Sequence, residues 1–362
     1  MQPSISHRCW LALAASLLVG SGCHAIPIHG TIHTDANANV QGAFQAKVDV
    51  HMPTTTDPGP MVPSVVRHGA SGPGCPRVAL IDVDGLLLNQ NLTGLYSAGE
   101  NPVAAFREKL EAAASDLSVR AIVVRINSPG GGVTATDILS EELRRFRGQT
   151  GKPAVACLMD LATGGAYYLA IGCDRVVAHP TTVTGGVGAM VNHFNLQDAA
   201  SQLNVSADPV KAGDLVDMGS VMGPLKGEPR ELLQAMINTF RDRFLARVTA
   251  RRPAMTAQDR KAIADGRVIT GPQAHALHMV DRVGYADDAI AEAEHLASVS
   301  GAEVILFQHA GNPAHSIYAI TPNVPIQNDL IPFSYPGLDR SKLPTFLYLW
   351  QPDPTLIRQS GR

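Results

Sequence analysis

The stretch Val119–Gly132, VRAIVVRINSPGGG, decides the fold class. Six of its first eight residues are apolar, and most are β-branched, which is typical of a strand buried on both faces of a parallel sheet. Asn127–Gly132 then breaks the run with one proline and three consecutive glycines, so the strand must end in a tight turn. Thr134 or Thr136 can cap a following helix that continues to about Phe146.

The same alternation continues on both sides of this stretch. Further apolar, strand-like runs lie at Arg77–Asp84, Pro153–Met159 and Arg175–Ala178. Helical spacing of apolar residues occurs at Pro102–Asp116, Gly164–Ala170, Glu228–Arg251 and Ala286–Ser298. Strands that alternate with helices predict an α/β architecture with a parallel sheet.

The first residues have the pattern of an export signal. A polar start is followed by an apolar core at Cys9–Gly20 and then by Ser21-Gly22-Cys23. A cysteine after small residues is typical of bacterial lipoproteins, in which residues 1–22 are removed and the Cys23 thiol is acylated. Cleavage after Ala25, which would leave no lipid, is the alternative. We therefore expect an exported lipoprotein of the bacterial cell envelope, and His24 in place of aspartate favours the periplasmic face of the outer membrane.

The chain divides into four expected parts. Residues 1–22 form the signal peptide, and residues 23–75, rich in Pro, Thr, His and Gly, form a lipid-anchored linker. Within the linker, Val40–Met52 alternates apolar and polar residues as a strand would. Residues 76–300 form the folded domain. Residues 301–362 hold many prolines and an apolar end, FLYLWQP, and we expect an extended arm that packs on the domain or on a neighbour.

Composition excludes several classes of function. The formal net charge is −3, so no basic excess is available to neutralise the phosphates of a nucleic acid. The sequence contains no run of eighteen apolar residues, so no membrane-spanning helix is predicted. The cysteines lack metal-binding spacing, and Cys157 and Cys173 are interpreted as buried apolar side chains, with a disulfide between them as the alternative. The histidines of the linker also lack tight ligand spacing, so neither a metal nor another cofactor is expected.

Four segments carry a resemblance to a known family. They are Arg125–Gly131 (RINSPGG), Asp160–Ala170 (DLATGGAYYLA), Thr184–Gly188 (TGGVG) and Asp265–Gly271 (DGRVITG). In this order they resemble the signal peptide peptidase A, or protease IV, family of serine peptidases in the ClpP/crotonase superfamily, over roughly Arg77–Ser298. The resemblance implies a parallel sheet with repeated β-β-α units, a serine–lysine dyad, and a homo-oligomer in which neighbouring subunits complete the site.

The glycine-rich turn is the expected oxyanion site. Backbone N–H groups at such a turn can stabilise a tetrahedral oxyanion, and glycine lets a substrate approach the main chain closely. Gly130 and Gly131 are therefore the candidate donors. The alternative is that the turn only connects a strand to a helix.

Both dyad positions are substituted. When Asp160 and the two tyrosines at 167 and 168 are placed in register with the family pattern Asp-x-Ala-Ala-Ser-Gly-Gly-Tyr-Tyr, Gly164 stands where the serine belongs. Glycine has no side chain to form an acyl-enzyme. The family pattern Lys-Ser-Gly-x-x-Lys-Asp corresponds to Lys211–Asp217, in which Val216 takes the place of the basic lysine. Valine cannot accept a proton.

Three functions follow from these substitutions. The first is a catalytically inactive family member that binds peptide or signal-peptide segments or acts as an envelope scaffold, held to the membrane by its lipid. The second is an active peptidase that uses Thr163, or a serine such as Ser128, in place of the missing nucleophile, although Thr163 also suits a helix N-cap. The third is crotonase-like chemistry on acyl thioesters, because Ala162–Ala178 is similar to the crotonase segment that supplies an oxyanion amide.

Overall fold

The computed structural model describes residues 60–69, 74–90, 92–94, 97–309, 317 and 346–350. All of them belong to one compact unit, Pro53–Arg362. The expected signal peptide at 1–22, the lipidation site Cys23 and the strand-like stretch Val40–Met52 lie outside the described residues.

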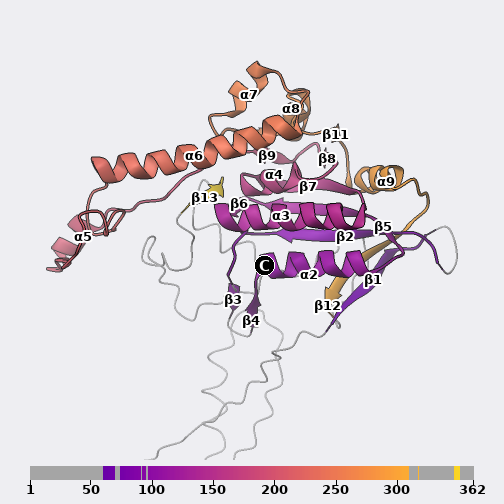
Figure 1. The fold of residues 1–362 in the computed structure, drawn as a ribbon, viewed down its shortest axis with the longest axis horizontal. Coiled ribbons are helices and arrows are strands. Elements are labelled where there is room, and N and C mark those ends of the chain that lie inside the picture. Colours follow the sequence, from indigo (N-terminus) through magenta and orange to yellow (C-terminus); the bar gives the residue numbers. More distant parts are fainter. Residues whose placement is uncertain are drawn as a thin grey trace, which may run out of the picture. The chain divides into compact units, whose positions relative to one another are not determined.

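A largely parallel sheet forms the centre of the domain (Figure 1). Its main path runs β1-β12-β2-β5-β7-β8-β11, and β9 pairs with both β7 and β10. The pairs are parallel except β1 with β12 and β9 with β10. The bounds are β1 Met61–Arg67, β2 Arg77–Asp84, β5 Val119–Ser128, β7 Ala154–Thr163, β8 Arg175–Ala178, β9 Val183–Gly185, β10 Val268–Thr270, β11 Arg282–Val283 and β12 Glu303–His309. The predicted α/β fold with a parallel sheet is confirmed.

The sheet is covered on both faces, which explains why its strands are apolar at consecutive positions. Residues 79, 81 and 83 of β2 and 122, 124 and 126 of β5 pack against α2, α3 and α4, whereas residues 78, 80, 121 and 123 pack against α9. Figure 1 shows α2 and α3 in front of the sheet. The helices are α2 Pro102–Ser115, α3 Val133–Thr150, α4 Gly165–Ala170, α5 Gln197–Gln202, α6 Glu228–Arg251, α7 Ala257–Ile263, α8 Gly271–Ala276 and α9 Ala286–Leu296.

Among the described residues, four short strands lie outside this sheet. β3 (Leu92–Gly94) pairs with β4 (Ser97–Glu100), and β6 (Gly130–Gly132) pairs with β13 (Leu347–Leu349). β6 follows β5 directly and leads into α3, which makes one β-β-α unit. None of the helices in the described ranges has the length and apolarity that crossing a membrane requires.

The sheet extends beyond the domain bounds expected at residues 76 and 300. β1 lies in the expected linker, and β12 lies in the expected arm. The two strands pair antiparallel, and β12 also pairs in parallel with β2. β1 carries Pro63 and forms one edge of the sheet. An edge strand tolerates proline. Because β1 contains a proline, its sequence resembles that of the proline-rich linker.

A buried ion pair links the two central strands β2 and β5. The Arg125 guanidinium donates to the Asp82 carboxylate at 2.6 Å, and the two side chains are 3% and 1% exposed. Arg125 also donates to the carbonyl oxygen of Ile317. Removing one partner of a buried ion pair strongly lowers the stability of the folded protein.

We therefore predict that Arg125→Ala lowers the free energy of unfolding by about 3–5 kcal/mol, because it removes the guanidinium from a buried ion pair. Urea denaturation followed by circular dichroism measures this change. The matched control is Arg144→Ala, which removes an exposed pair with Glu141 at 2.7 Å and should cost less than about 0.5 kcal/mol. Equal effects of the two substitutions would contradict the prediction.

Candidate functional site

The predicted nucleophile position lies at a sharp reversal of the main chain. β7 ends at Thr163, Gly164 turns the chain, and α4 begins at Gly165. Gly164 has φ 55° and ψ −120°, a conformation that residues with a side chain rarely adopt. Its N–H donates to the Gly185 carbonyl oxygen at 2.9 Å. We call this turn the elbow.

The second glycine of the elbow is needed for packing. An ideal Cβ at Gly165 would overlap the Thr136 hydroxyl and lie 3.2 Å from the Thr136 methyl carbon. The absence of that Cβ lets α4 approach α3 closely. The first residue of α4 also lies close to β6, because an ideal Cβ at Gly130 would overlap the Tyr348 carbonyl oxygen and lie 2.8 Å from the Gly165 nitrogen.

The strand β6 uses its two edges differently. On one edge the Leu87 N–H donates to the Gly130 carbonyl oxygen, and the Gly132 N–H donates to the Leu87 carbonyl oxygen, both at 2.9 Å. The Gly130 N–H is also satisfied, because it donates to the Ser128 hydroxyl at 3.0 Å. The other edge, on which Gly131 pairs, faces β13. Of the two predicted oxyanion donors, Gly131 is therefore the one that faces a partner strand.

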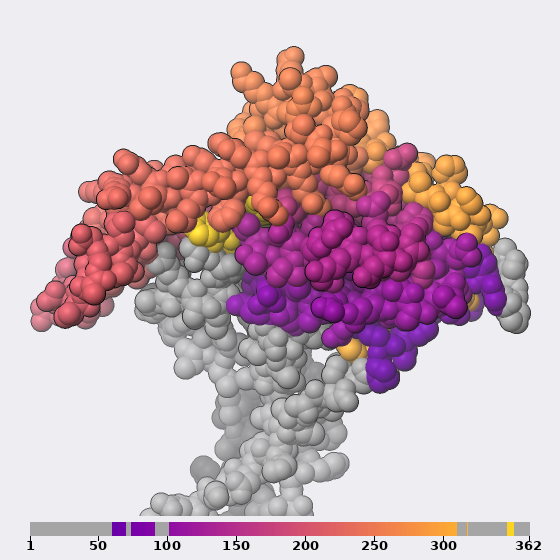
Figure 2. Space-filling view, in the orientation of Figure 1, coloured from indigo at the N-terminus to yellow at the C-terminus, as the bar shows by residue number. Residues whose placement is uncertain are grey.

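The partner strand β13 lies in a groove between β6 and Met190. It runs antiparallel to β6, with Tyr348 opposite Gly131. The flanking bonds are from the Val133 N–H to the Phe346 carbonyl oxygen and from the Trp350 N–H to the Pro129 carbonyl oxygen, both at 3.1 Å. On its other edge, Leu347 exchanges two hydrogen bonds of 3.0 Å with Met190. Figure 2 shows β13 in yellow between α6 and the part of the molecule that carries β6 and α3.

The main chain of β13 fills the space in front of the elbow. An ideal Cβ at Gly164 would overlap the Tyr348 carbonyl oxygen, and it would lie 2.7 Å from the Tyr348 carbonyl carbon and 3.0 Å from the Leu349 nitrogen. A nucleophile attacks a carbonyl carbon from close range. The peptide bond from Tyr348 to Leu349 therefore occupies the space that a side chain at position 164 would need.

The Tyr348 side chain enters an aromatic pocket. It is 1% exposed, stacks on Tyr168 with ring centroids 5.5 Å apart, and packs against Phe244 at 5.1 Å. Its hydroxyl donates to the Phe240 carbonyl oxygen at 2.7 Å. Burial raises the pKa of Tyr348 well above its usual value, so the hydroxyl keeps the proton that it donates. Arg247 lies over the Tyr168 ring at 4.5 Å and completes the wall by a cation–π contact.

The hydroxyl groups of the two candidate substitute nucleophiles, Thr163 and Ser128, make hydrogen bonds with the main chain. Thr163 is fully buried, and its hydroxyl donates to the Pro129 carbonyl oxygen at 3.1 Å. Ser128 is also fully buried and accepts from the Gly130 N–H. Neither hydroxyl is hydrogen-bonded to a lysine or histidine in the described part of the chain. Both residues shape the turn and the elbow.

The predicted base position is not beside the elbow within one chain. Val216 is 67% exposed and lies between α5 and α6, in the segment that Figure 1 shows at the projecting end of α6. α6 begins at Glu228 and contacts α4 through Phe244. The sixteen residue steps from Glu228 to Phe244 correspond to about 24 Å along the helix axis. Lys211, in the same segment, pairs with Asp217 at 2.9 Å.

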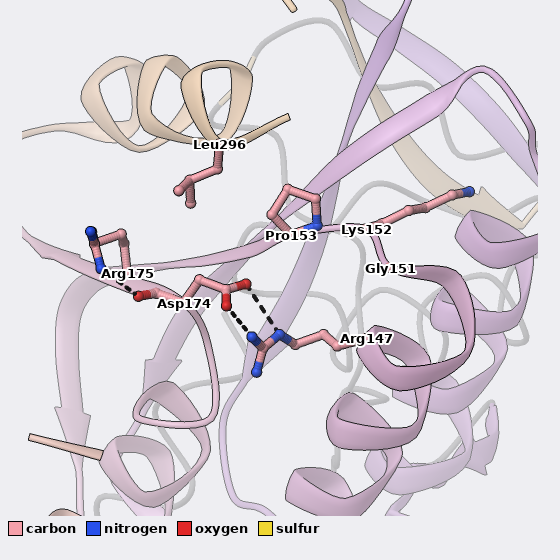
Figure 3. A pocket seen from close by; sticks show the side chains of 7 residues that line it. All are labelled: Arg147, Gly151, Lys152, Pro153, Asp174, Arg175 and Leu296. Atoms are coloured by element: carbon pink, nitrogen blue, oxygen red, sulfur yellow. Dashed lines mark hydrogen bonds and ion pairs between the residues drawn. The ribbon is translucent and has the colours of Figure 1, made fainter. Parts of the chain in front are cut away.

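A separate cavity of about 310 Å³ lies away from the elbow, where β7 and β8 begin (Figure 3). Arg147 and Asp174 form an ion pair across it, and Asp174 also accepts from the Ala154 N–H at 2.9 Å. Lys152 donates to the Ala113 and Asp116 carbonyl oxygens, and Arg175 pairs with Glu292, so the charged groups that line the cavity already have partners. In the described ranges, no group of three or more His, Cys, Asp or Glu side chains could hold a metal ion. Cys157 and Cys173 are buried and free.

We predict that Gly164→Ala destabilises the domain by about 1–3 kcal/mol through backbone strain and also displaces β13 from the elbow. Chemical denaturation measures the first effect, and Trp350 fluorescence reports the second. Gly148→Ala is the matched control, because its new Cβ meets nothing within 4 Å and alanine favours helix by roughly 0.5–1 kcal/mol. An unchanged unfolding midpoint for Gly164→Ala would contradict this account of the elbow.

Comparison with known proteins places the chain in a family. Residues 147–300 match the sequence model of peptidase family S49. Protease 4 of Salmonella typhi is 32% identical over 222 residues, which cover 61% of this chain and 35% of that protein. The Methanocaldococcus jannaschii protein "Putative protease MJ0651" is 30% identical over 213 residues, which cover 59% of this chain and 67% of that protein.

A solved structure is also similar. It is a mutant of the 1510-N membrane-bound stomatin-specific protease in complex with a substrate peptide, with 14% identity and a TM-score of 0.40 over 61% of this chain and 80% of that chain. The sequence matches include the elbow, α4 and the Asp265–Gly271 segment. On the strength of these sequence matches, the chain belongs to peptidase family S49.

Proposed function

We propose that this chain binds extended peptide segments in the groove beside β6 and does not hydrolyse them at the elbow. The observation that supports this proposal most directly is at Gly164. The elbow keeps the sharp turn into α4, carries no side chain, and has the main chain of β13 against it. Such an arrangement can hold an extended segment but offers no atom that could attack it.

The remaining parts of the site suit binding better than catalysis. Gly131 still presents the main chain of β6 to a partner strand, and pairing with a strand edge is a general way of recognising extended peptides. A working peptidase also needs a base within hydrogen-bond reach of its nucleophile, and Val216 supplies none. An oxyanion donor alone gives only a small residual rate.

We also propose, from the family resemblance, that the chain forms a homo-oligomer in the cell envelope, attached to the membrane through Cys23. Exposed apolar side chains support an interface on the segment around α5 and at the start of α6. They are Leu203, Val205, Val210, Val216, Leu232 and Met236. An apolar surface of this kind usually marks an interaction site. Signal-peptide segments are the peptide class that the resemblance implies.

We predict no hydrolysis of casein or of a signal peptide by the natural chain. The rate should lie at least about 10⁴-fold below that of a serine-containing S49 peptidase, because loss of a nucleophile has effects of this order. The assay follows peptide fragments by mass spectrometry. Cleavage by the natural chain that Thr163→Val or Ser128→Ala abolishes, with the fold intact by circular dichroism, would overturn the proposal.

For the oligomer, we predict that the double substitution Val210→Asp/Val216→Asp weakens self-association at least about tenfold, because it places charges on an apolar contact surface. Light scattering after size exclusion measures the mass. Leu117→Asp is the matched control, since Leu117 is 88% exposed but lies between α2 and β5. A natural chain that is monomeric at micromolar concentration would refute the oligomer.

A further inference from the structure

The groove beside β6 already contains a peptide segment, and that segment belongs to the chain itself. We call residues Phe346–Trp350 the tail segment. Its main chain is bonded along both edges, to Pro129, Gly131 and Val133 on one side and to Met190 on the other. A strand held on both edges has most of its backbone groups satisfied, as a bound extended peptide would.

Two side chains of the tail segment are buried, Leu347 and Tyr348, and Tyr348 is the aromatic one. Tyr348 fills the pocket formed by Tyr168 and Phe244 and donates to the Phe240 carbonyl oxygen. Phe346 makes a second aromatic contact, with Phe240, at 5.1 Å. Leu349 and Trp350 are only partly buried. A buried aromatic side chain of this kind is a usual anchor in a peptide complex.

The Tyr348 hydroxyl has a hydrogen-bond acceptor at the base of the pocket. The Phe240 carbonyl oxygen belongs to α6, and it accepts the Tyr348 hydroxyl. A phenylalanine would keep the ring contacts but leave this carbonyl without its hydroxyl donor. An alanine would lose the ring contacts with Tyr168 and Phe244 as well.

The tail segment reaches the groove from a distance in the sequence. Thirty-six residues separate it from His309, the last residue of β12. A segment of the same chain competes with any outside peptide at a raised effective concentration, because its binding is an intramolecular step. The described contacts of the tail segment span five residues, and a peptide with the same anchor can exchange with it.

We propose that the groove beside β6 is a receptor for extended peptides with a tyrosine anchor, and that the tail segment is its resident ligand, which an outside peptide must displace. This inference rests on the proposed peptide-binding function and adds the class of ligand and its control. The occupied groove reduces the apparent affinity for an outside peptide in proportion to the fraction of molecules whose groove is open.

The test uses the full chain and the fluorescein-labelled peptide TFLYLWQ, which is the sequence of residues 345–351, with two lysines added for solubility. Fluorescence anisotropy gives the Kd for the natural chain and for its Tyr348→Ala variant. Because the variant loses the anchor of its own tail segment, we expect it to bind the peptide at least about tenfold more tightly. The peptide TFLALWQ should bind the variant at least about tenfold more weakly than TFLYLWQ, and TFLFLWQ should lie between them.

A second measurement does not depend on the added peptide. The Val133 and Met190 N–H groups donate to the tail segment, so their hydrogen exchange should be faster in Tyr348→Ala and slow again when TFLYLWQ saturates the variant. Circular dichroism and the exchange rates of β5 and β7 show whether the variant keeps its fold.

The outcomes separate the two proposals. If both chains bind TFLYLWQ equally well and the exchange at Val133 and Met190 is unchanged, the tail segment is not the resident ligand, while peptide binding stands. If the variant binds TFLALWQ as tightly as TFLYLWQ, the tyrosine anchor is wrong. If neither chain binds TFLYLWQ or a signal peptide, the proposed peptide-binding function itself falls.

Discussion

Strand β7 passes into helix α4 through one residue, Gly164, and the arrangement of the groove depends on that reversal. The positive φ of this residue turns the chain within one step, so that α4 begins beside β6. Tyr167 and Tyr168 follow at once in the helix. Tyr167 is buried, with its hydroxyl on the Met279 carbonyl oxygen at 2.9 Å, and it fixes the helix. Tyr168 can then serve as one wall of the aromatic pocket.

Much of the fold could be predicted from the sequence because its central strands are buried on both faces. Such strands show continuous apolar runs, and the runs at Arg77–Asp84, Val119–Ile126 and Arg175–Ala178 all correspond to strands of the sheet. The elbow could also be located, since a strand followed by two glycines and a tyrosine-containing helix has a distinctive pattern. Gly130 and Gly131 could be assigned to a turn, but not distinguished from each other. That distinction depends on which glycine N–H donates its hydrogen bond to the Ser128 hydroxyl.

The partner of β6 could not be predicted in the same way. A strand of three glycines has no side chains whose pattern could select another strand, so its pairing with Leu347–Leu349 depends on main-chain geometry and on the pocket for Tyr348. The apolar end of the chain suggested packing on the domain or on a neighbour, without a location. β1 and β12 were missed for a related reason. They pair across more than 230 residues of sequence, and composition alone assigns Met61–Arg67 to a linker.

The close contact between position 164 and the tail segment makes these two distant parts of the chain depend on each other. A serine at position 164 would have to tolerate a strained backbone and would also overlap the main chain of Tyr348. A side chain at position 164 therefore costs stability while the tail segment stays in place, and removing the tail segment alone exposes the rings of Tyr168 and Phe244. Each single step is unfavourable while the other is absent. The elbow and the tail segment are therefore structurally coupled, because a glycine at position 164 and the strand that lies against it fit only together.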